Sequence, residues 1–146
     1  MKIKSLTIYC SASQKLDKKF YKLAEETAKI ISNYPIKVIY GGGNVGLMGI
    51  IAKTLTNLKS EVIGVIPKFL IKKEKVSFNI SQLKIVPSMS KRKEYLFKLG
   101  DVFLILPGGT GTLEEVIEVL SWKVLKLHNK PIIFLNFDNY WSPLIK

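Results

Sequence analysis

The feature that most constrains the fold is an alternation along the chain. Short apolar runs rich in β-branched residues are separated by longer segments in which apolar residues recur at helical spacing. This alternation is typical of βαβ units, which build a mostly parallel sheet with helices on both faces. Most runs are apolar almost throughout, as strands buried on both faces should be. The predicted strands are Leu6–Cys10, Lys37–Tyr40, Val62–Ile66, Leu83–Val86, Val102–Leu106 and Ile132–Leu135.

Four segments between these strands have the period of amphipathic helices. They are Asp17–Asn33, Gly46–Asn57, Lys91–Leu99 and Leu113–Leu127. The least patterned stretch, Pro67–Gln82, is rich in lysine, and we predict a mobile basic loop or a short helix over the sheet edge, with a solvated surface as the simpler interpretation. We find no repeat and no linker, so residues 1–146 are predicted to form a single domain.

Composition narrows the class of protein. With 146 residues, of which 47% are hydrophobic, the chain has the size and apolar content of one globular domain. No apolar stretch approaches the roughly 20 residues that span a bilayer, and the N-terminus lacks the apolar run of a signal peptide. A cytoplasmic protein with no membrane insertion is therefore expected. The net charge of +12 favours anionic partners such as nucleotides, nucleic acid or acidic lipid, without choosing among them.

In an open parallel sheet, ligands bind beyond the carboxyl ends of the strands, so the loops after the strands carry the functional information. Four of these loops are unusual, and all should open onto the same side. They are Ser11–Ser13, Gly41–Gly46, Pro87–Lys93 and Pro107–Thr112.

The loop Pro107–Thr112 is predicted to bind phosphate. Its glycines permit close backbone approach, and its N–H groups face the same point as the N-terminus of the next helix. Thr110 and Thr112 can add hydroxyl donors. Thr112 also has the position of an N-cap, with Glu115 three residues on at the spacing of a capping box. The alternative interpretation of Glu115 is that it only caps this helix.

The loop Gly41–Gly46 formally fits the G-x-G-x-x-G pattern of a dinucleotide site, which is a weak signal by itself. In such a site an acidic residue at the end of the next strand holds the ribose. Here that strand ends in Ile66-Pro67-Lys68, which contains no acidic residue, so the sequence does not support a dinucleotide site. No G-K-[ST] follows either glycine loop, so nucleoside triphosphate chemistry is not expected.

A pair of charged residues can complete a site next to the phosphate loop. Arg92 lies near the start of the helix after the fourth strand, from which it can point over the crevice at Glu115. Arg92 and its neighbours Lys91 and Lys93 oppose the helix macrodipole, and an anionic ligand would explain them. With one cysteine and one histidine, the chain is predicted to hold no transition-metal site.

Three motifs together resemble the LOG ("Lonely Guy") family of cytokinin riboside 5′-monophosphate phosphoribohydrolases, often mislabelled lysine decarboxylases. They are Gly41-Gly42-Gly43-Asn44-Val45-Gly46-Leu47-Met48-Gly49, Met89-x-x-Arg92-Lys93 and Pro107-Gly108-Gly109-Thr110-Gly111-Thr112-x-x-Glu115. The resemblance implies a Rossmann-like homodimer that uses no cofactor and no metal, and that hydrolyses the N-glycosidic bond of adenine or cytokinin nucleoside 5′-monophosphates. It makes Arg92 and Glu115 the catalytic pair and assigns the 5′-phosphate to Gly109, Thr110, Gly111 and Thr112. Further substrate contacts are expected from Ser11, Gly42, Gly43, Met89 and Lys93.

The chain departs from the family pattern at two places. Ser90 stands where the family usually has histidine, which would alter a contact near the base or at the dimer interface. The chain also stops at Lys146, so it is expected to lack the family's C-terminal helical segment.

Two other functions remain open from the sequence. A non-catalytic nucleotide or molybdenum-cofactor carrier is the first, since related Rossmann-like proteins with a similar glycine loop have that role. The presence of both Arg92 and Glu115 favours the enzyme over the carrier. Nucleic-acid binding ranks last, because only the net charge and the basic stretch at 68–75 support it.

Overall fold

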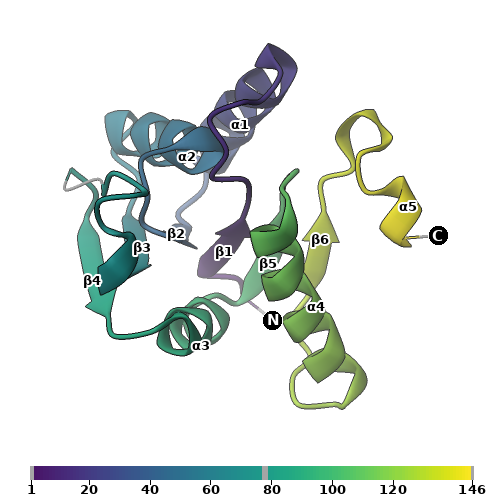
Figure 1. The fold of residues 1–146 in the computed structure, drawn as a ribbon. Coiled ribbons are helices and arrows are strands. Elements are labelled where there is room, and N and C mark those ends of the chain that lie inside the picture. Colours follow the sequence, from purple (N-terminus) through teal and green to yellow (C-terminus); the bar gives the residue numbers. More distant parts are fainter. Residues whose placement is uncertain (1, 77–78, 146) are drawn as a thin grey trace.

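The sheet has six strands, all parallel. The computed structural model describes residues 2–76 and 79–145, and its strands follow the order β4-β3-β2-β1-β5-β6 (Figure 1). The strands are β1 Ser5–Tyr9, β2 Lys37–Tyr40, β3 Val62–Pro67, β4 Gln82–Val86, β5 Val102–Ile105 and β6 Ile132–Phe134. Every predicted strand is present, with its ends shifted by no more than one residue. The prediction of an α/β fold with a parallel sheet is confirmed.

Helices cover both faces of this sheet, as predicted. Two of them, α1 and α2, lie on one face, and α3 and α4 lie on the other (Figure 1). The bounds are α1 Lys18–Ile31, α2 Gly46–Asn57, α3 Met89–Leu99, α4 Thr110–Val124 and α5 Ser142–Ile145, with short 3-10 turns η1 Lys68–Leu70 and η2 Phe137–Asn139. No helix among the described residues is long and apolar enough to cross a membrane.

Two hydrophobic cores, one on each face, hold the helices to the sheet. Ala24 and Ala28 of α1 and Leu47 and Ile51 of α2 are fully buried against the first face. Leu96 of α3 and Val116 and Val119 of α4 fill the second core together with β-strand side chains. Removal of apolar surface from water is the dominant favourable term in folding. The two cores therefore fix the positions of the helices on the sheet, and with them the positions of the helix N-termini.

The helix after β5 begins earlier than its apolar pattern predicts. The pattern starts at Leu113, but α4 begins at Thr110 and ends at Val124. The N–H of Leu113 donates to the carbonyl of Gly109 at 2.9 Å, which makes Gly109 the N-cap. The second half of the glycine loop, Thr110–Thr112, is therefore the first turn of the helix.

The strand order reverses between β1 and β5. The chain runs outward from β1 to β4 and then returns to place β5 on the opposite side of β1. The loops after β1 and β5 therefore leave in different directions, which opens a crevice at the carboxyl ends of these two strands. The N–H of Ser11 donates to the carbonyl of Pro107 at 3.1 Å and ties the two loops together at this point.

Candidate active site

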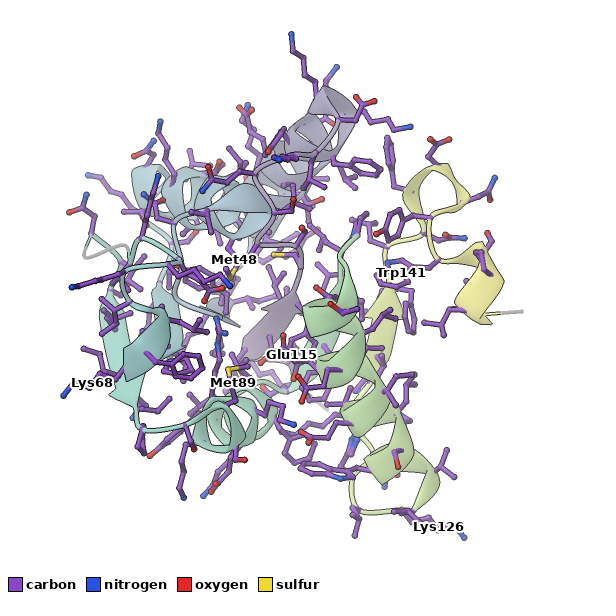
Figure 2. All side chains as sticks on the ribbon, in the orientation of Figure 1. Met48, Lys68, Met89, Glu115, Lys126 and Trp141 are labelled. Carbon is purple, nitrogen blue, oxygen red and sulfur yellow. The ribbon has the colours of Figure 1, made fainter. Side chains whose placement is uncertain are left out.

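A cleft of about 350 Å³ lies at this crevice. It brings together residues from three of the four predicted loops, and Figure 2 shows Met48, Met89 and Glu115 at the same central part of the molecule. Its lining residues are Cys10, Ser11, Ala12, Ser13, Met48, Leu70, Glu74, Met89, Arg92, Gly109, Thr110, Gly111, Thr112 and Glu115. The predicted catalytic pair and the predicted phosphate loop thus share one cavity.

A larger hollow of about 600 Å³ lies at the opposite, amino ends of the strands. Lys4, Lys37, Glu61 and Asp101 are among its lining residues. None of the four unusual loops reaches it, so its size does not make it the better candidate for chemistry.

The first turn of α4 forms one wall of the cleft. The N–H groups of Thr110, Gly111 and Thr112 are the first of the helix and have no intrahelical acceptor. Among the described residues, only chain neighbours and the helix's own backbone lie within 4 Å of the position that a Cβ would take at Gly109 or at Gly111, and the whole turn lines the cleft. Three convergent N–H groups with the positive end of a helix dipole behind them suit a phosphate.

The capping box predicted at this helix is wrong. Thr112 lies inside the first turn and is buried, and Gly109 caps the helix without a side-chain hydrogen bond. The hydroxyl of Thr112 packs against Gly108, where a Cβ would overlap it. Since Glu115 comes six residues after the N-cap, it lies in the second turn and has no capping role.

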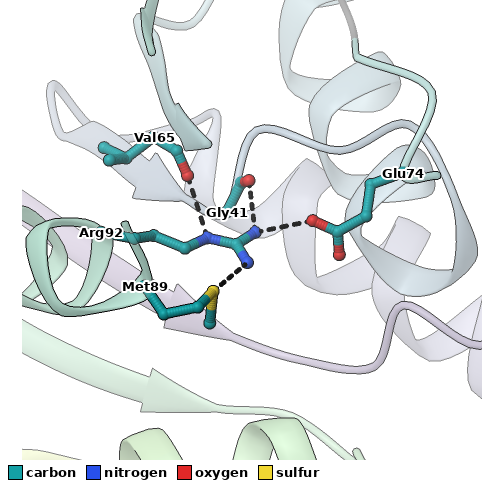
Figure 3. Close-up of polar contacts among 5 residues, drawn as sticks. All are labelled: Gly41, Val65, Glu74, Met89 and Arg92. Carbon is teal, nitrogen blue, oxygen red and sulfur yellow. Dashed lines mark hydrogen bonds and ion pairs between the residues drawn. The ribbon is translucent and has the colours of Figure 1, made fainter. Parts of the chain in front are cut away.

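Arg92 of α3 forms the opposite wall and has three oxygen acceptors (Figure 3). Its Nε donates to the carbonyl of Val65 at 3.0 Å, and its Nη2 donates to the carbonyl of Gly41 and to Glu74 Oε1, the latter at 3.0 Å. The Sδ of Met89 lies 4.0 Å from Nη1. The guanidinium is buried and almost fully satisfied before any ligand binds.

The ion-pair partner of Arg92 therefore differs from the prediction. Within residues 2–76 and 79–145, Arg92 pairs with Glu74 and forms no ion pair with Glu115. Glu74 is itself buried, with 9% of its surface exposed, and it comes from the stretch that we predicted to be a solvated basic loop. It is the one acid among Lys68, Lys72, Lys73 and Lys75, and that contrast was the signal available in the sequence.

Glu115 carries the most informative electrostatics of the cleft. Burial raises its pKa to about 7, and the nearby carboxylates of Glu114 and Glu74 act in the same direction. The positive charges of Arg92 and Lys93 oppose that rise without cancelling it. A carboxyl group that titrates near neutral pH can both accept and return a proton under physiological conditions.

Three residues predicted to contact the substrate do not line the cleft. Gly42 and Gly43 are buried under neighbouring strands and side chains, where Gly42 adopts a φ of +80°. Lys93 reaches across to α4 and forms ion pairs with Glu114 at 2.9 Å and Glu118 at 3.1 Å. The structure gives these three residues packing and bridging contacts instead.

The remaining predicted contacts, Ser11 and Met89, do line the cleft. Cys10 joins them at the end of β1, where burial raises the pKa of its thiol above the ordinary value. Among the described residues, no group of three or more histidine, cysteine, aspartate or glutamate side chains could hold a metal ion.

The fold and the cleft define a class: a Rossmann-like α/β protein with a cleft at the switch point of its sheet. Solved structures share this fold. The molybdenum cofactor carrier protein of Chlamydomonas reinhardtii matches 91% of this chain and 76% of its own with a TM-score of 0.74, at 20% identity. The molybdenum cofactor binding protein of Rippkaea orientalis matches 92% and 77% with a TM-score of 0.72, also at 20% identity. Likeness at this identity shows the fold alone.

Sequence comparison defines the family. The family model described as "possible lysine decarboxylase" matches residues 48–146. The cytokinin riboside 5′-monophosphate phosphoribohydrolase of Rhodococcoides fascians is 41% identical over 143 residues, which are 97% of this chain and 72% of that protein. A probable enzyme of the same name from Oryza sativa is 38% identical over 99% of this chain and 58% of its own length. The chain belongs to this family, the LOG family.

Proposed function

We propose that this protein is a phosphoribohydrolase that cleaves the N-glycosidic bond of nucleoside 5′-monophosphates of adenine or N6-substituted adenine. The products would be the free base and ribose 5-phosphate. The observation that carries the proposal is the meeting of Glu115, with its pKa of about 7, and the open first turn of α4 in one cleft. The activity for which the relatives from Rhodococcoides fascians and Oryza sativa are named supports the same reaction.

The phosphate would bind at the N–H groups of Thr110, Gly111 and Thr112, with Gly109 leaving the approach open. Binding energy from this remote group would hold the sugar in place and so position the scissile bond. The net charge of +12 steers an anionic substrate towards the protein.

Glu115 follows the phosphate turn by about one helical turn, which puts its carboxylate on the sugar side of the cleft. As the C1′–N9 bond breaks, its electron pair leaves with the base, and C1′ takes on the positive charge of an oxocarbenium ion. The Glu115 carboxylate stabilises that charge and accepts the proton of the water whose oxygen bonds to C1′. The departing base takes a proton from solvent at its nitrogen, and Glu115 releases the proton of the attacking water to solvent, which balances the hydrolysis.

Arg92 would contribute a fixed positive charge at the edge of the cleft. Its guanidinium is held by acceptors on the protein, so it costs no reorganisation when negative charge develops on the leaving base. Ser11 and Met89 would complete the walls around the substrate.

Two measurements test the proposal. Incubation with AMP and with its N6-isopentenyl analogue, followed by chromatography, should detect free base. In a thermal melt, AMP at a hundred times its dissociation constant should stabilise the fold by about 2.7 kcal/mol, and adenosine should not. Equal stabilisation by adenosine would contradict the phosphate site, and binding of AMP without release of base would favour a non-catalytic nucleotide carrier.

We also propose that the protein is a cytoplasmic homodimer. Apolar side chains of α4, including Ile117 at 49% and Val124 at 81% exposure, support an interface on that helix. The cytoplasm holds nucleotides and keeps a lone thiol such as that of Cys10 reduced. Light scattering after size exclusion should give twice the mass of the chain, and a monomer at micromolar concentration would contradict the dimer.

A further inference from the structure

Arg92 is the only arginine among the chain's 23 basic residues. Every other basic position uses lysine, so ordinary surface charge does not require a guanidinium in this sequence. At position 92 the side chain donates in three directions at once, to Val65, Gly41 and Glu74 (Figure 3). A planar fork of donors can make these contacts, and the compact ammonium group of lysine cannot.

The backbone of Glu74 is fixed from two sides. Its N–H donates to the carbonyl of Leu70 at 2.8 Å, and its carbonyl accepts the N–H of Asn44 at 2.7 Å. Gly43 packs closely against it, because a Cβ there would meet the Glu74 Cβ at 3.0 Å. These contacts hold the backbone of Glu74 in place, so its carboxylate lies next to Arg92 in the protein interior and not in solvent.

Glu115 is surrounded by groups whose charges act on it from every neighbouring element. Arg92 and Lys93 come from α3, Glu74 from the turn after η1, and Glu114 from α4 itself. On the side of β1, the un-ionised Tyr9 hydroxyl and Cys10 thiol are close enough to feel its charge. Of these groups, only Arg92 is both a permanent cation and a lining residue of the same cleft.

Without Glu74, that buried cation would have no counter-ion. A buried unpaired charge is strongly unfavourable, so the guanidinium would turn to Glu115, the other carboxylate among the described residues that line the cleft. An ion pair there would hold Glu115 ionised, weaken it as a base and occupy the oxygen that should face the sugar.

We propose that Glu74 is a positioning residue of the hydrolysis: it is the counter-ion that holds Arg92 at the Gly41 and Val65 carbonyls and keeps this guanidinium out of an ion pair with Glu115. The inference rests on the proposed function for its kinetic consequence. Its structural consequence, the separation of Arg92 from Glu115, is independent of any reaction.

The test compares Glu74→Gln with Glu74→Asp. The glutamine can still accept a hydrogen bond from Arg92 but carries no charge, whereas the aspartate keeps the charge on a shorter side chain. Glu94→Gln is the matched control, because Glu94 lies on the same helix as Arg92, is exposed, and pairs with Lys91 at the surface. The first measurement is the titration of the Glu115 carboxyl by ¹³C NMR on glutamate-labelled protein, assigned through the spectrum of Glu115→Gln.

In Glu74→Gln the Glu115 titration should move down by about one pH unit, because the variant removes the Glu74 charge that raises this pKa and gives the Glu115 carboxyl group a cationic neighbour. In Glu74→Asp it should stay nearer to the wild-type position, and in Glu94→Gln it should not move. An unchanged titration in a folded Glu74→Gln protein would overturn the proposal. If Glu74→Gln does not fold, Glu74→Asp decides. A Glu115 titration like that of wild type in Glu74→Asp supports the proposal, and one lowered by the amount expected for an ion pair between Arg92 and Glu115 overturns it.

The second measurement is base release across the pH range. Glu74→Gln should lower kcat by about 10-fold to 100-fold, with the acid limb displaced downward and KM little changed. A merely structural role would lower the melting temperature without displacing that limb. Absence of base release by wild type would refute the proposed function, and the NMR titration would still decide the role of Glu74.

Discussion

The two glycine loops of this protein use glycine for opposite purposes. In the loop after β2, a Cβ at Gly41 would overlap the Arg92 guanidinium, and one at Gly43 would meet Met48 and Glu74. In the loop after β5, a Cβ at Gly109 or Gly111 would meet nothing within 4 Å. Side chains of the protein close off Gly41 and Gly43, as Thr112 closes off Gly108, whereas Gly109 and Gly111 leave room for a ligand.

This contrast explains why the G-x-G-x-x-G pattern of the first loop is misleading. The carbonyl of Gly41 accepts a hydrogen bond from Arg92, and protein atoms surround both Gly41 and Gly42. Gly42 and Gly46 have a positive φ, which glycine adopts readily. We expect phosphate to bind at the other loop, whose short glycine-rich segment is the exposed start of a long helix. A glycine motif thus predicts that other atoms pack closely against the backbone, but it does not show whether they belong to the protein or to a ligand.

The largest effect is expected from the side chain that fills the first loop. Arg92→Lys keeps the charge but cannot donate to three acceptors together, so turnover should fall by about 10²-fold to 10⁴-fold. Base release under saturating AMP measures it. Lys91→Arg, at the exposed neighbouring position, is the control and should stay within twofold of wild type by the usual rule for surface changes. An active Arg92→Lys enzyme would show that the three-way contact has no catalytic purpose.

A matched pair of glycine substitutions tests the contrast directly. Gly41→Ala forces Arg92 or the loop to move and should destabilise the protein by about 1–3 kcal/mol, as overpacking does. Gly111→Ala adds a methyl group in open space within a helix and should leave stability unchanged or raise it by up to about 1 kcal/mol. Denaturant unfolding measures both values.

The same two variants should reverse their order in binding. Gly111→Ala places its methyl group where the phosphate approaches, so AMP affinity measured by calorimetry should drop by about 10-fold, the equivalent of roughly 1.4 kcal/mol. Gly41→Ala should bind AMP more nearly as wild type does. Equal losses of stability in the two variants would remove the distinction between a filled loop and an open one.

Burial of Glu115 in the cleft should lower the free energy of unfolding by an amount that depends on pH. The pKa of Glu115 rises from 4.5 to about 7 on folding. Between these two pH values the folded state binds more protons than the unfolded state. The free energy of unfolding is therefore highest below pH 4.5, where Glu115 is protonated in both states, and it decreases as the pH rises through 7. Allowing for its partial exposure, Glu115→Gln should stabilise the protein by about 1–2 kcal/mol at pH 8 and by little at pH 4. A variant that is less stable than wild type at pH 8 would contradict this assignment.

The smallest effect is expected at the edge of the open loop. The Tyr140 hydroxyl donates to the carbonyl of Gly108 at 2.7 Å and steadies the entrance of the phosphate turn. Tyr140→Phe removes one partly exposed hydrogen bond, which contributes about 1 kcal/mol, so AMP affinity should weaken by roughly fivefold or less. Tyr34→Phe, on an exposed residue at the other end of the sheet, is the control.

The strands and the placement of the loops could be predicted from the sequence because both depend on local pattern. An apolar run such as Val102–Leu106 can be buried only as a strand of a covered sheet, and the loop after it must then open at the carboxyl edge. The start of α4 was predicted three residues late, because Thr110, Gly111 and Thr112 lack the apolar periodicity by which a helix is recognised. Backbone hydrogen bonding, not side-chain pattern, decides that helix start.

The partner of Arg92 is a different kind of fact. Its three acceptors, Val65, Gly41 and Glu74, lie 27, 51 and 18 residues away along the chain. The sequence by itself determined that a cation and a carboxylate belong at the edge of a phosphate crevice. Only the tertiary structure decided that the cation is neutralised by Glu74, because desolvation makes a buried guanidinium bind whichever acceptors packing brings within reach. Within residues 2–76 and 79–145, the same packing leaves Glu115 without an ion pair beside the open start of α4.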